Sequence, residues 1–189
     1  MCGKCFVPDL ARWAPGTGTP VAREAGLRVK INCVVMKGVN DHEIPAFHDF
    51  SAGTGIEVRF LEMMRIGPAR AMSESHFLST AAILEALEAH AGALDDLPST
   101  PDSTVFRKRS RAGAFLGFMG SESGAFCGTC SRLRLSARGI LHPCLFREDG
   151  VDLRGASEGE IQDRVRAVAP LKPMDRIHEI ARPMHRIGG

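Results

Sequence analysis

The sequence has no tyrosine, a single tryptophan and no apolar run of about 18 residues, the length that a membrane-spanning helix needs. The N-terminus, Met1-Cys2-Gly3-Lys4-Cys5, lacks the apolar core of a secretory signal, so we expect a cytoplasmic chain without membrane attachment. An excess of one charge is also lacking. The formal net charge is +2 with 24% charged residues, which argues against disorder and against wholesale nucleic-acid binding. The 189 residues predict one large domain or two small ones, with a core that needs no disulfide.

Six cysteines are the most informative residues that are present, and in a cytoplasmic chain they indicate metal or redox roles. Cys127-x2-Cys130 and the later Cys144 form an array, with Arg132 and Arg134 between its second and third members. Three thiolates are one fewer than the four that close a zinc site or saturate a four-iron cluster. The spacing therefore predicts a metal centre with an open coordination position. The two cations beside it suit a phosphate or a carboxylate.

A closed zinc site is the alternative interpretation of the same array. His142 lies two residues before Cys144 on one predicted hairpin strand, so both side chains would point to the same face. Three cysteines and this histidine would complete a tetrahedral zinc site, and the chain would then be a non-catalytic binding module. Against that hypothesis, Arg132 and Arg134 alternate with two leucines. At strand periodicity this places both guanidinium groups on one face and both leucines on the other.

The first half of the chain has the pattern of a β-α-β unit. Residues 29–36 and 56–63 are mostly apolar and β-branched, which predicts strands buried on both faces. Asn40, with Glu43 three residues later, predicts a capping box for a helix that runs to about Ser51. A strand, a helix and a strand in this order predict two parallel neighbouring strands.

Further helices and hairpins follow from capping and turn residues. The predicted helices cover residues 21–25, 80–90 (after a Ser79 or Thr80 cap) and the segment from the Ser157–Glu160 capping box to before Pro170. The predicted hairpins cover residues 105–118, with a turn near Gly113, and residues 133–145, with a turn at Arg138-Gly139. Proline and glycine mark residues 1–20 as a loose leader and the segment from Pro170 as a tail.

Two cations lie in the predicted parallel strands. Lys30 and Arg59 each interrupt an otherwise apolar strand, and a buried charge is costly unless it is paired or faces a ligand. Either residue alone is compatible with a side chain that reaches solvent from a strand end. Together, in neighbouring strands, they indicate an anion site, with Glu62 as an acidic partner for one of them.

The remaining cysteines and a basic run carry less information. Cys2 and Cys5 repeat the Cys-x2-Cys spacing, and we interpret them as disordered thiols at the N-terminus. Cys33 lies within an apolar strand and is expected to be a small core residue. Residues 107–111 predict a solvated hairpin face, because no aromatic side chain interleaves the charges as in nucleic-acid binding surfaces.

Four segments, in this order and spacing, carry a resemblance that runs from about residue 21 to Gly189. They are Lys30-Ile31-Asn32 with Gly38-Val39-Asn40-Asp41, Arg59-Phe60-Leu61-Glu62-Met63-Met64, Phe126-Cys127 through Pro143-Cys144-Leu145-Phe146, and Gly188-Gly189. The chain thereby resembles the C-terminal half of the molybdenum cofactor biosynthesis protein A family, the radical S-adenosylmethionine enzyme GTP 3′,8-cyclase.

The resemblance implies a role for each matched residue. The ligands of a [4Fe-4S] cluster, whose fourth iron stays open for the guanine base, are matched by Cys127, Cys130 and Cys144. The positions that hold GTP are matched by Lys30, Arg59, Arg132, Leu133 and Arg134. Met64 matches a contact to S-adenosylmethionine, and Gly188-Gly189 match a tail that reaches into the family's active site.

The resemblance also implies an α/β fold. Residues 1–20 would be an unstructured leader, and residues 21–97 the last part of an incomplete radical-enzyme (β/α) barrel. Residues 98–189 would be a cluster-binding α+β region that ends in the double glycine.

The sequence departs from the family in three respects, the first of which is that roughly the first half of the barrel is missing. The family's first cluster binds S-adenosylmethionine through a Cys-x3-Cys-x2-Cys loop that is absent here, and Ser131 stands where the family usually has Asn. We therefore expect a GTP- and cluster-binding half of a radical lyase that makes the cyclic pterin precursor of molybdopterin. Alone it would be inactive and carry out no radical chemistry. Its expected partner is a chain that supplies the N-terminal half of the barrel, or a second copy; a truncated gene, a frameshift product or a split-gene subunit would each give this sequence.

Overall fold

The computed structural model describes residues 18–100, 103–124, 127–175, 177 and 180–187. Two compact units divide the chain. The first comprises residues up to Glu62, His76–Ser99 and Val105–Gly120, and the second Met63–Ser75, Thr100–Thr104 and the residues from Ser121 onward. Each unit has its own hydrophobic cluster. None of the helices in the described part of the chain combines the length and the apolar character needed to cross a membrane.

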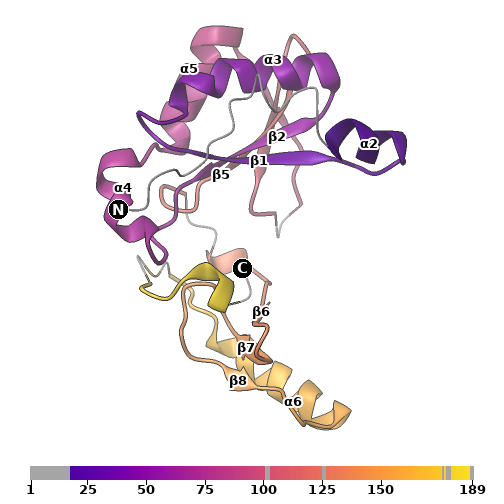
Figure 1. Ribbon diagram of the computed structural model, residues 1–189, viewed down its shortest axis with the longest axis vertical. Coiled ribbons are helices and arrows are strands. Elements are labelled where there is room, and N and C mark those ends of the chain that lie inside the picture. Colours follow the sequence, from indigo (N-terminus) through magenta and orange to yellow (C-terminus); the bar gives the residue numbers. More distant parts are fainter. Residues whose placement is uncertain (1–17, 101–102, 125–126, 176, 178–179, 188–189) are drawn as a thin grey trace. The chain divides into compact units, whose positions relative to one another are not determined.

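The first unit contains most of the regular structure (Figure 1). Its elements are α2 (Gly18–Glu24), β1 (Lys30–Val35), η1 (Asp41–Glu43), α3 (Ile44–Thr54), β2 (Glu57–Glu62), α5 (Thr80–Ala91), β3 (Leu94–Leu97), β4 (Phe106–Ser110) and β5 (Phe115–Met119). The second unit contains α4 (Ala69–His76, whose last residue belongs to the first unit), η2 (Cys127–Thr129), β6 (Arg134–Leu135), β7 (Ile140–His142), β8 (Val151–Asp152), α6 (Glu158–Val168), η3 (Ala169–Leu171) and η4 (Met184–Arg186).

A five-stranded mixed sheet in the order β1-β2-β5-β4-β3 forms the centre of the first unit. The predicted parallel pairing of β1 with β2 is confirmed, and β5 continues it in parallel on the other side of β2. The predicted hairpin is confirmed as β4 and β5, joined through Gly113 at a φ of 92°. Among the described residues the sheet is open, with β1 and β3 at its edges, so it is a mixed α/β layer rather than a closed barrel.

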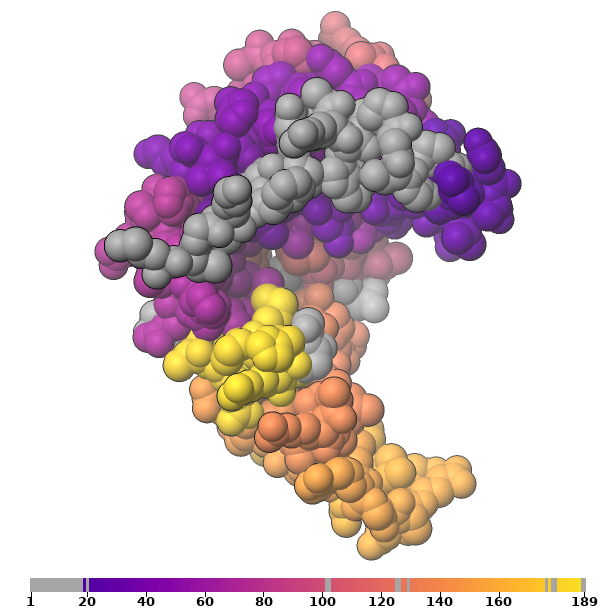
Figure 2. All heavy atoms as spheres, viewed as in Figure 1, coloured from indigo at the N-terminus to yellow at the C-terminus, as the bar shows by residue number. Residues whose placement is uncertain are grey.

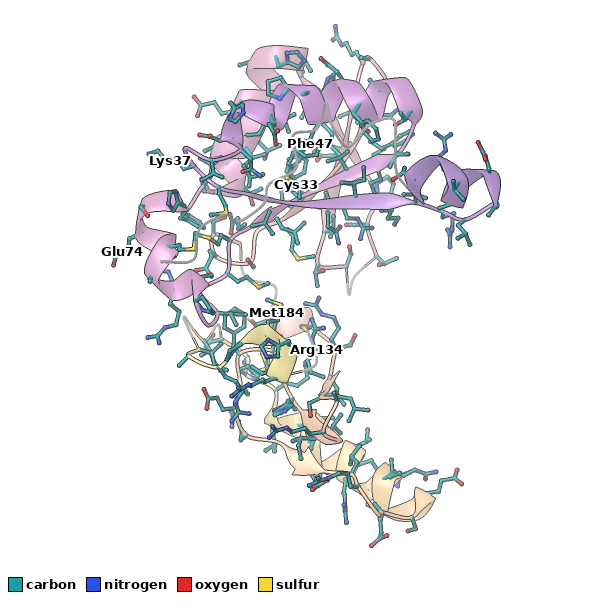
Figure 3. All side chains as sticks on the ribbon, in the orientation of Figure 1. Cys33, Lys37, Phe47, Glu74, Arg134 and Met184 are labelled. Atoms are coloured by element: carbon teal, nitrogen blue, oxygen red, sulfur yellow. The ribbon has the colours of Figure 1, made fainter. Side chains whose placement is uncertain are left out.

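Helices α3 and α5 cover one face of this sheet, and the main core lies between them and the strands (Figure 1). Cys33 and Phe47 lie in this layer in Figure 3. The prediction that β1 and β2 are buried on both faces is wrong. In β1, Lys30, Asn32 and Val34 are exposed and alternate with less exposed residues. Apolar residues such as Val34 on the outer face made the strand resemble one that is buried on both sides.

The Asn40–Glu43 capping box is also wrong. The Asn40 side chain is buried and turns back toward β1, where its Oδ1 accepts from the Met36 N–H at 2.7 Å and its Nδ2 donates to the Val34 carbonyl at 3.0 Å. Helix α3 begins only at Ile44, after the turn η1, and ends at Thr54. The predicted Ser79 cap and the Ser157–Glu160 capping box are confirmed.

The second unit consists of short elements around a small apolar cluster. The predicted β6–β7 hairpin is confirmed, and β8 adds a third antiparallel strand. The segment expected to be a tail contributes to the core, because Ile180 pairs with Ile66 and Ile187 is fully buried beside them. Most residues of α6 are exposed, and its light-orange atoms lie at the surface in Figure 2.

A buried carboxylate fastens β2 to α5. Glu62 is 1% exposed, and its Oε1 accepts from the Thr80 N–H at 2.7 Å and from the Thr80 hydroxyl at 2.9 Å. A carboxylate is favourable there because Thr80 begins helix α5, whose first N–H groups lack partners within the helix. Glu62 is therefore not the partner of Arg59, which lies three positions earlier and so points to the opposite face of the strand.

We expect Glu62→Ala to lower the free energy of unfolding by about 3 kcal/mol, because Thr80 loses a charged acceptor in a buried place. Glu62→Gln keeps an oxygen acceptor and should cost about 1 kcal/mol. Urea unfolding curves measure both values, with Glu88→Ala on the exposed face of α5 as the control. Equal stability of Glu62→Ala and the unchanged chain would contradict this role.

Candidate functional site

The three cysteines of the array lie on two tight turns of the second unit. Cys127 begins η2, and the Cys130 N–H donates to the Cys127 carbonyl at 3.2 Å. Cys144 follows β7, and its carbonyl accepts from the Arg147 N–H at 3.2 Å. All three are partly exposed thiols rather than disulfides, which leaves the sulfur atoms available as ligands.

Backbone N–H groups point at two of these sulfur atoms. The Phe146 N–H donates to Cys144 Sγ at 3.4 Å. Burial raises the pKa of Cys130, but hydrogen bonds from the Arg132 side chain and backbone and the charges of Arg132 and Lys172 outweigh it, so the net pKa is lowered. Donors of this kind favour the thiolate, which is the form of cysteine that binds metals.

Lys172 joins the two turns of the array, a role that its sequence context does not predict. Its Nζ donates to the Arg132 carbonyl at 2.5 Å and to the Pro143 carbonyl at 3.1 Å, and lies 3.7 Å from Cys130 Sγ. No local signal marks this lysine, since it follows α6 and η3 in the segment that was expected to be a tail. The contact depends on chain reversal over 29 to 42 residues, which a local pattern does not encode.

Arg132 and Arg134 both lie beside the array. Burial lowers the pKa of Arg134, and the charge of Arg132 lowers it further, while Cys130 and Cys144 act in the opposite direction. Arg134, labelled in Figure 3, lies in β6 opposite His142, whereas Arg132 precedes the strand. Leu135, the second residue of β6, is 57% exposed. Leu133 lies just before β6 and is partly buried.

The cysteine array is not among the close groups of metal-ligand side chains in the described part of the chain. In the described part of the chain, only one group of three His, Cys, Asp or Glu residues has its ligand atoms within 4.8 Å of one another, and it contains no cysteine. Thiolates that share one zinc ion lie about 4 Å apart, as bonds of about 2.3 Å in a tetrahedron require. His142 is buried, with Nδ1 2.9 Å from the Asp149 carbonyl oxygen.

Lys30 and Arg59 share a carboxylate in the first unit. Lys30 Nζ lies 3.5 Å from Glu57 Oε2, and Arg59 Nε donates to Glu57 Oε1 at 2.6 Å. The side chains are 45% and 24% exposed, so the lysine is the more accessible cation. Gly117 pairs with Arg59 in the sheet, and a Cβ there would lie 2.9 Å from Arg59 Cγ. The absent side chain leaves room for the arginine on the outer face.

Of the other residues singled out in the sequence, those that the structure describes have contacts of their own. Met64 packs, partly buried, against the Ile66–Ile180–Ile187 cluster of the second unit. Burial, with a contribution from Glu43, raises the pKa of Cys33 to about 12, so this core thiol is not a reactive residue. The basic hairpin contacts its own neighbours, as in the 2.9 Å ion pair of Lys108 with Asp96. Gly188, Gly189, Cys2 and Cys5 lie outside the described residues.

The second unit of this mixed α/β chain groups three thiols with Arg132, Arg134 and Lys172. Such a set of side chains is typical of metal- and anion-binding proteins. Sequence comparison identifies the particular group. The family described as Molybdenum Cofactor Synthesis C matches residues 56–175, more than half of the chain, and the chain belongs to this family.

Several relatives are named GTP 3′,8-cyclase. The protein of Synechocystis sp. is 38% identical over 89% of this chain and 51% of its own length. That of Thermodesulfovibrio yellowstonii is 37% identical over 91% of this chain and 56% of its own length, and that of Erythrobacter litoralis 38% over 77% and 44%. The chain thus spans about half the length of these relatives. The resemblance inferred from four motifs is confirmed as homology to the C-terminal region of GTP 3′,8-cyclases.

We expect Lys172→Met to lose bound metal about 10-fold faster than the unchanged chain, because the two turns are no longer joined and a charge beside the sulfur atoms is removed. Iron and acid-labile sulfide per chain, followed over time after anaerobic reconstitution and desalting, measure the loss. Lys172→Arg keeps the charge and should be intermediate, and the exposed Lys37→Met serves as a control in the other unit. Equal retention in Lys172→Met and Lys37→Met would show that the joining contact is unimportant.

Proposed function

We propose that this chain is the GTP- and [4Fe-4S]-binding half of an enzyme of molybdenum cofactor biosynthesis. The observation that carries the proposal is the grouping of three thiols with Arg132, Arg134 and Lys172 in one unit. The names of the relatives supply the reaction, in which GTP is the substrate of a cyclase. In this family S-adenosylmethionine is the co-substrate, and the described sheet would be the last part of its barrel.

The donor set fits an open iron–sulfur cluster. Cys127, Cys130 and Cys144 supply three thiolates, and a four-iron cluster has four iron atoms to ligate. Hydrogen bonds from N–H groups to Cys130 and Cys144 are a means by which proteins stabilise and tune such clusters. The iron without a cysteine ligand would be open to a ring atom of the guanine base.

The cations are suited to the triphosphate of the nucleotide. Arg132 and Arg134 carry planar guanidinium groups that bind phosphate oxygens in pairs, and Leu133 offers an apolar contact between them. In the first unit, Glu57 neutralises one of the two charges of Lys30 and Arg59, so the trio keeps a net charge of +1. Lys30, the more exposed of the two cations, is free to exchange its 3.5 Å ion pair for a phosphate. Met64 and the double glycine would contact S-adenosylmethionine and the active site.

The partner that we propose is a chain that carries the preceding strands of the family. In the described residues β1 is an edge strand, and its parallel pairing with β2 is the arrangement that further parallel strands would extend. The relatives are about twice as long as this chain, so they contain residues that could supply those strands. Sedimentation of the purified chain at rising concentration separates the outcomes: a stable dimer would assign the edge to a second copy, and a monomer is the expected result.

The metal content tests the cluster. Iron, zinc and acid-labile sulfide are measured on the anaerobically purified chain, and we expect iron and sulfide in equal amounts. Zinc without sulfide would refute the proposal and favour a module stapled by zinc. Incubation with S-adenosylmethionine should give no cleavage, and cleavage products would show that this chain alone carries out radical chemistry.

The nucleotide site is tested through Arg134. We expect Arg134→Gln to weaken GTP binding about 10-fold, because one charged hydrogen-bonding group is lost. Equilibrium binding under anaerobic conditions measures the change. Arg138→Gln, an exposed residue at the turn of the same hairpin, is the matched control and should bind like the unchanged chain. Equal losses in the two variants would indicate a general effect of charge rather than a site.

A further inference from the structure

A second group of metal-ligand side chains lies in the first unit, where no role has been assigned. It consists of His48 and Asp49 on α3 and His90 in the last turn of α5. One ligand atom from each residue lies within 4.8 Å of the other two. Two nitrogen donors and one carboxylate are a ligand set that zinc and similar divalent ions accept in proteins.

The ligand atoms already face one another. His48 Nδ1 and His90 Nε2 each lie 2.8 Å from the same oxygen, Asp49 Oδ1. The two imidazole rings meet edge to face with centroids 5.2 Å apart. Bonds of about 2.1 Å from a central ion to each ligand require separations of about 3.4 Å, so the carboxylate need move outward by only about half an ångström.

The buried histidine is also oriented from its far side. His48 Nε2 lies 2.9 Å from Ser110 Oγ, and that oxygen accepts from the Ala114 N–H at 3.2 Å. In metal sites, the ring nitrogen that does not bind the ion is usually held by such a neighbour, which fixes the tautomer that presents the other nitrogen to the metal. Ser110 lies at the end of β4, so the sheet itself positions His48 Nδ1 toward Asp49.

The opposite side of the group is open to solvent. The Asp49 side chain is 63% exposed and that of His90 35% exposed, whereas His48 is buried. An ion can therefore enter from solvent, and water can occupy the coordination position that three protein ligands leave open.

We propose that His48, Asp49 and His90 bind a zinc-class divalent ion that ties helix α3 to the end of helix α5. This site is separate from the cysteine array in its ligands and in its unit of the fold. Its residues supply nitrogen and oxygen ligands, whereas the array supplies sulfur ligands. The ion stabilises the packing of two helices against the sheet and takes no part in the chemistry of GTP.

Cobalt(II) distinguishes the two kinds of site, because thiolate ligands give it intense near-ultraviolet charge-transfer bands that nitrogen and oxygen ligands do not. The full chain is first reconstituted with iron and sulfide to occupy the cysteines and is then titrated with Co²⁺. The comparison variant is His90→Gln, whose amide can still donate to Asp49 Oδ1 but does not replace the imidazole nitrogen. The control is His42→Ala, an exposed histidine of the same unit.

We expect the full chain and His42→Ala to bind one equivalent of Co²⁺ with weak visible bands and no thiolate bands. His90→Gln should bind at least about 10-fold more weakly. Zinc should raise the midpoint of thermal unfolding in the first two proteins and not in His90→Gln. Equal Co²⁺ affinity in His90→Gln and the full chain, or a zinc-induced shift of the same size in both, would overturn the proposal and leave the three residues as a hydrogen-bonded contact between helices.

Discussion

The apolar layer between the five-stranded sheet and helices α3 and α5 determines which side chains of the first unit face outward. Phe60 and Phe118 are fully buried in this layer, as are Ile83 and Leu87 from α5, and each contributes about 2 kcal/mol through burial. The ion pair of Lys30 with Glu57 is worth less than about 1 kcal/mol, because the Lys30 side chain is 45% exposed. Packing therefore fixes the register, and the cations follow from it. A slip of one residue would bury Arg59 and expose Phe60.

The second unit is held together more by polar contacts than by apolar packing. Its apolar cluster of Ile66, Ile180 and Ile187 is small, and the turns that carry the cysteines are held mainly by polar contacts. Structures of this kind gain much of their stability from the group that they bind, since metal binding and folding share one free energy. The polar contacts that bring the sulfur atoms together also place positive charges beside them. In the function proposed above, the same residues would hold the array and attract an anion.

The sequence predicted elements whose signals are local. The β-α-β unit, the two hairpins and the Ser157–Glu160 capping box follow from period, turn and capping residues within a few positions of one another. Strand β3 was not predicted, because its sequence, Leu-Asp-Asp-Leu, is typical of a loop. It becomes a strand only through pairing with β4, where Asp95 and Asp96 meet Arg109 and Lys108.

In the candidate sites too, the features with a local sequence signal could be predicted and those formed by distant residues could not. The cysteine spacing and the arginines between the cysteines are visible in one short segment, so they could be predicted. Glu62 was expected to pair with Lys30 or Arg59, whereas both cations pair with Glu57. Glu57 and Glu62 both lie nearby in sequence, and only the face of the strand separates them. Lys172 and the group around Asp49 join residues 29 to 42 positions apart, and no pattern within one element reveals them.

The position of Lys172 in the chain sets an order of events during synthesis. The ribosome delivers all three array cysteines well before this lysine, and the isoleucines of the small apolar cluster arrive later still, at positions 180 and 187. A nascent chain that has not yet reached residue 172 therefore presents the three thiols without the contacts that Lys172 makes to both turns. Insertion of the proposed cluster would therefore wait until the segment that carries Lys172, Ile180 and Ile187 has folded back, or depend on a carrier that shields the thiols until then.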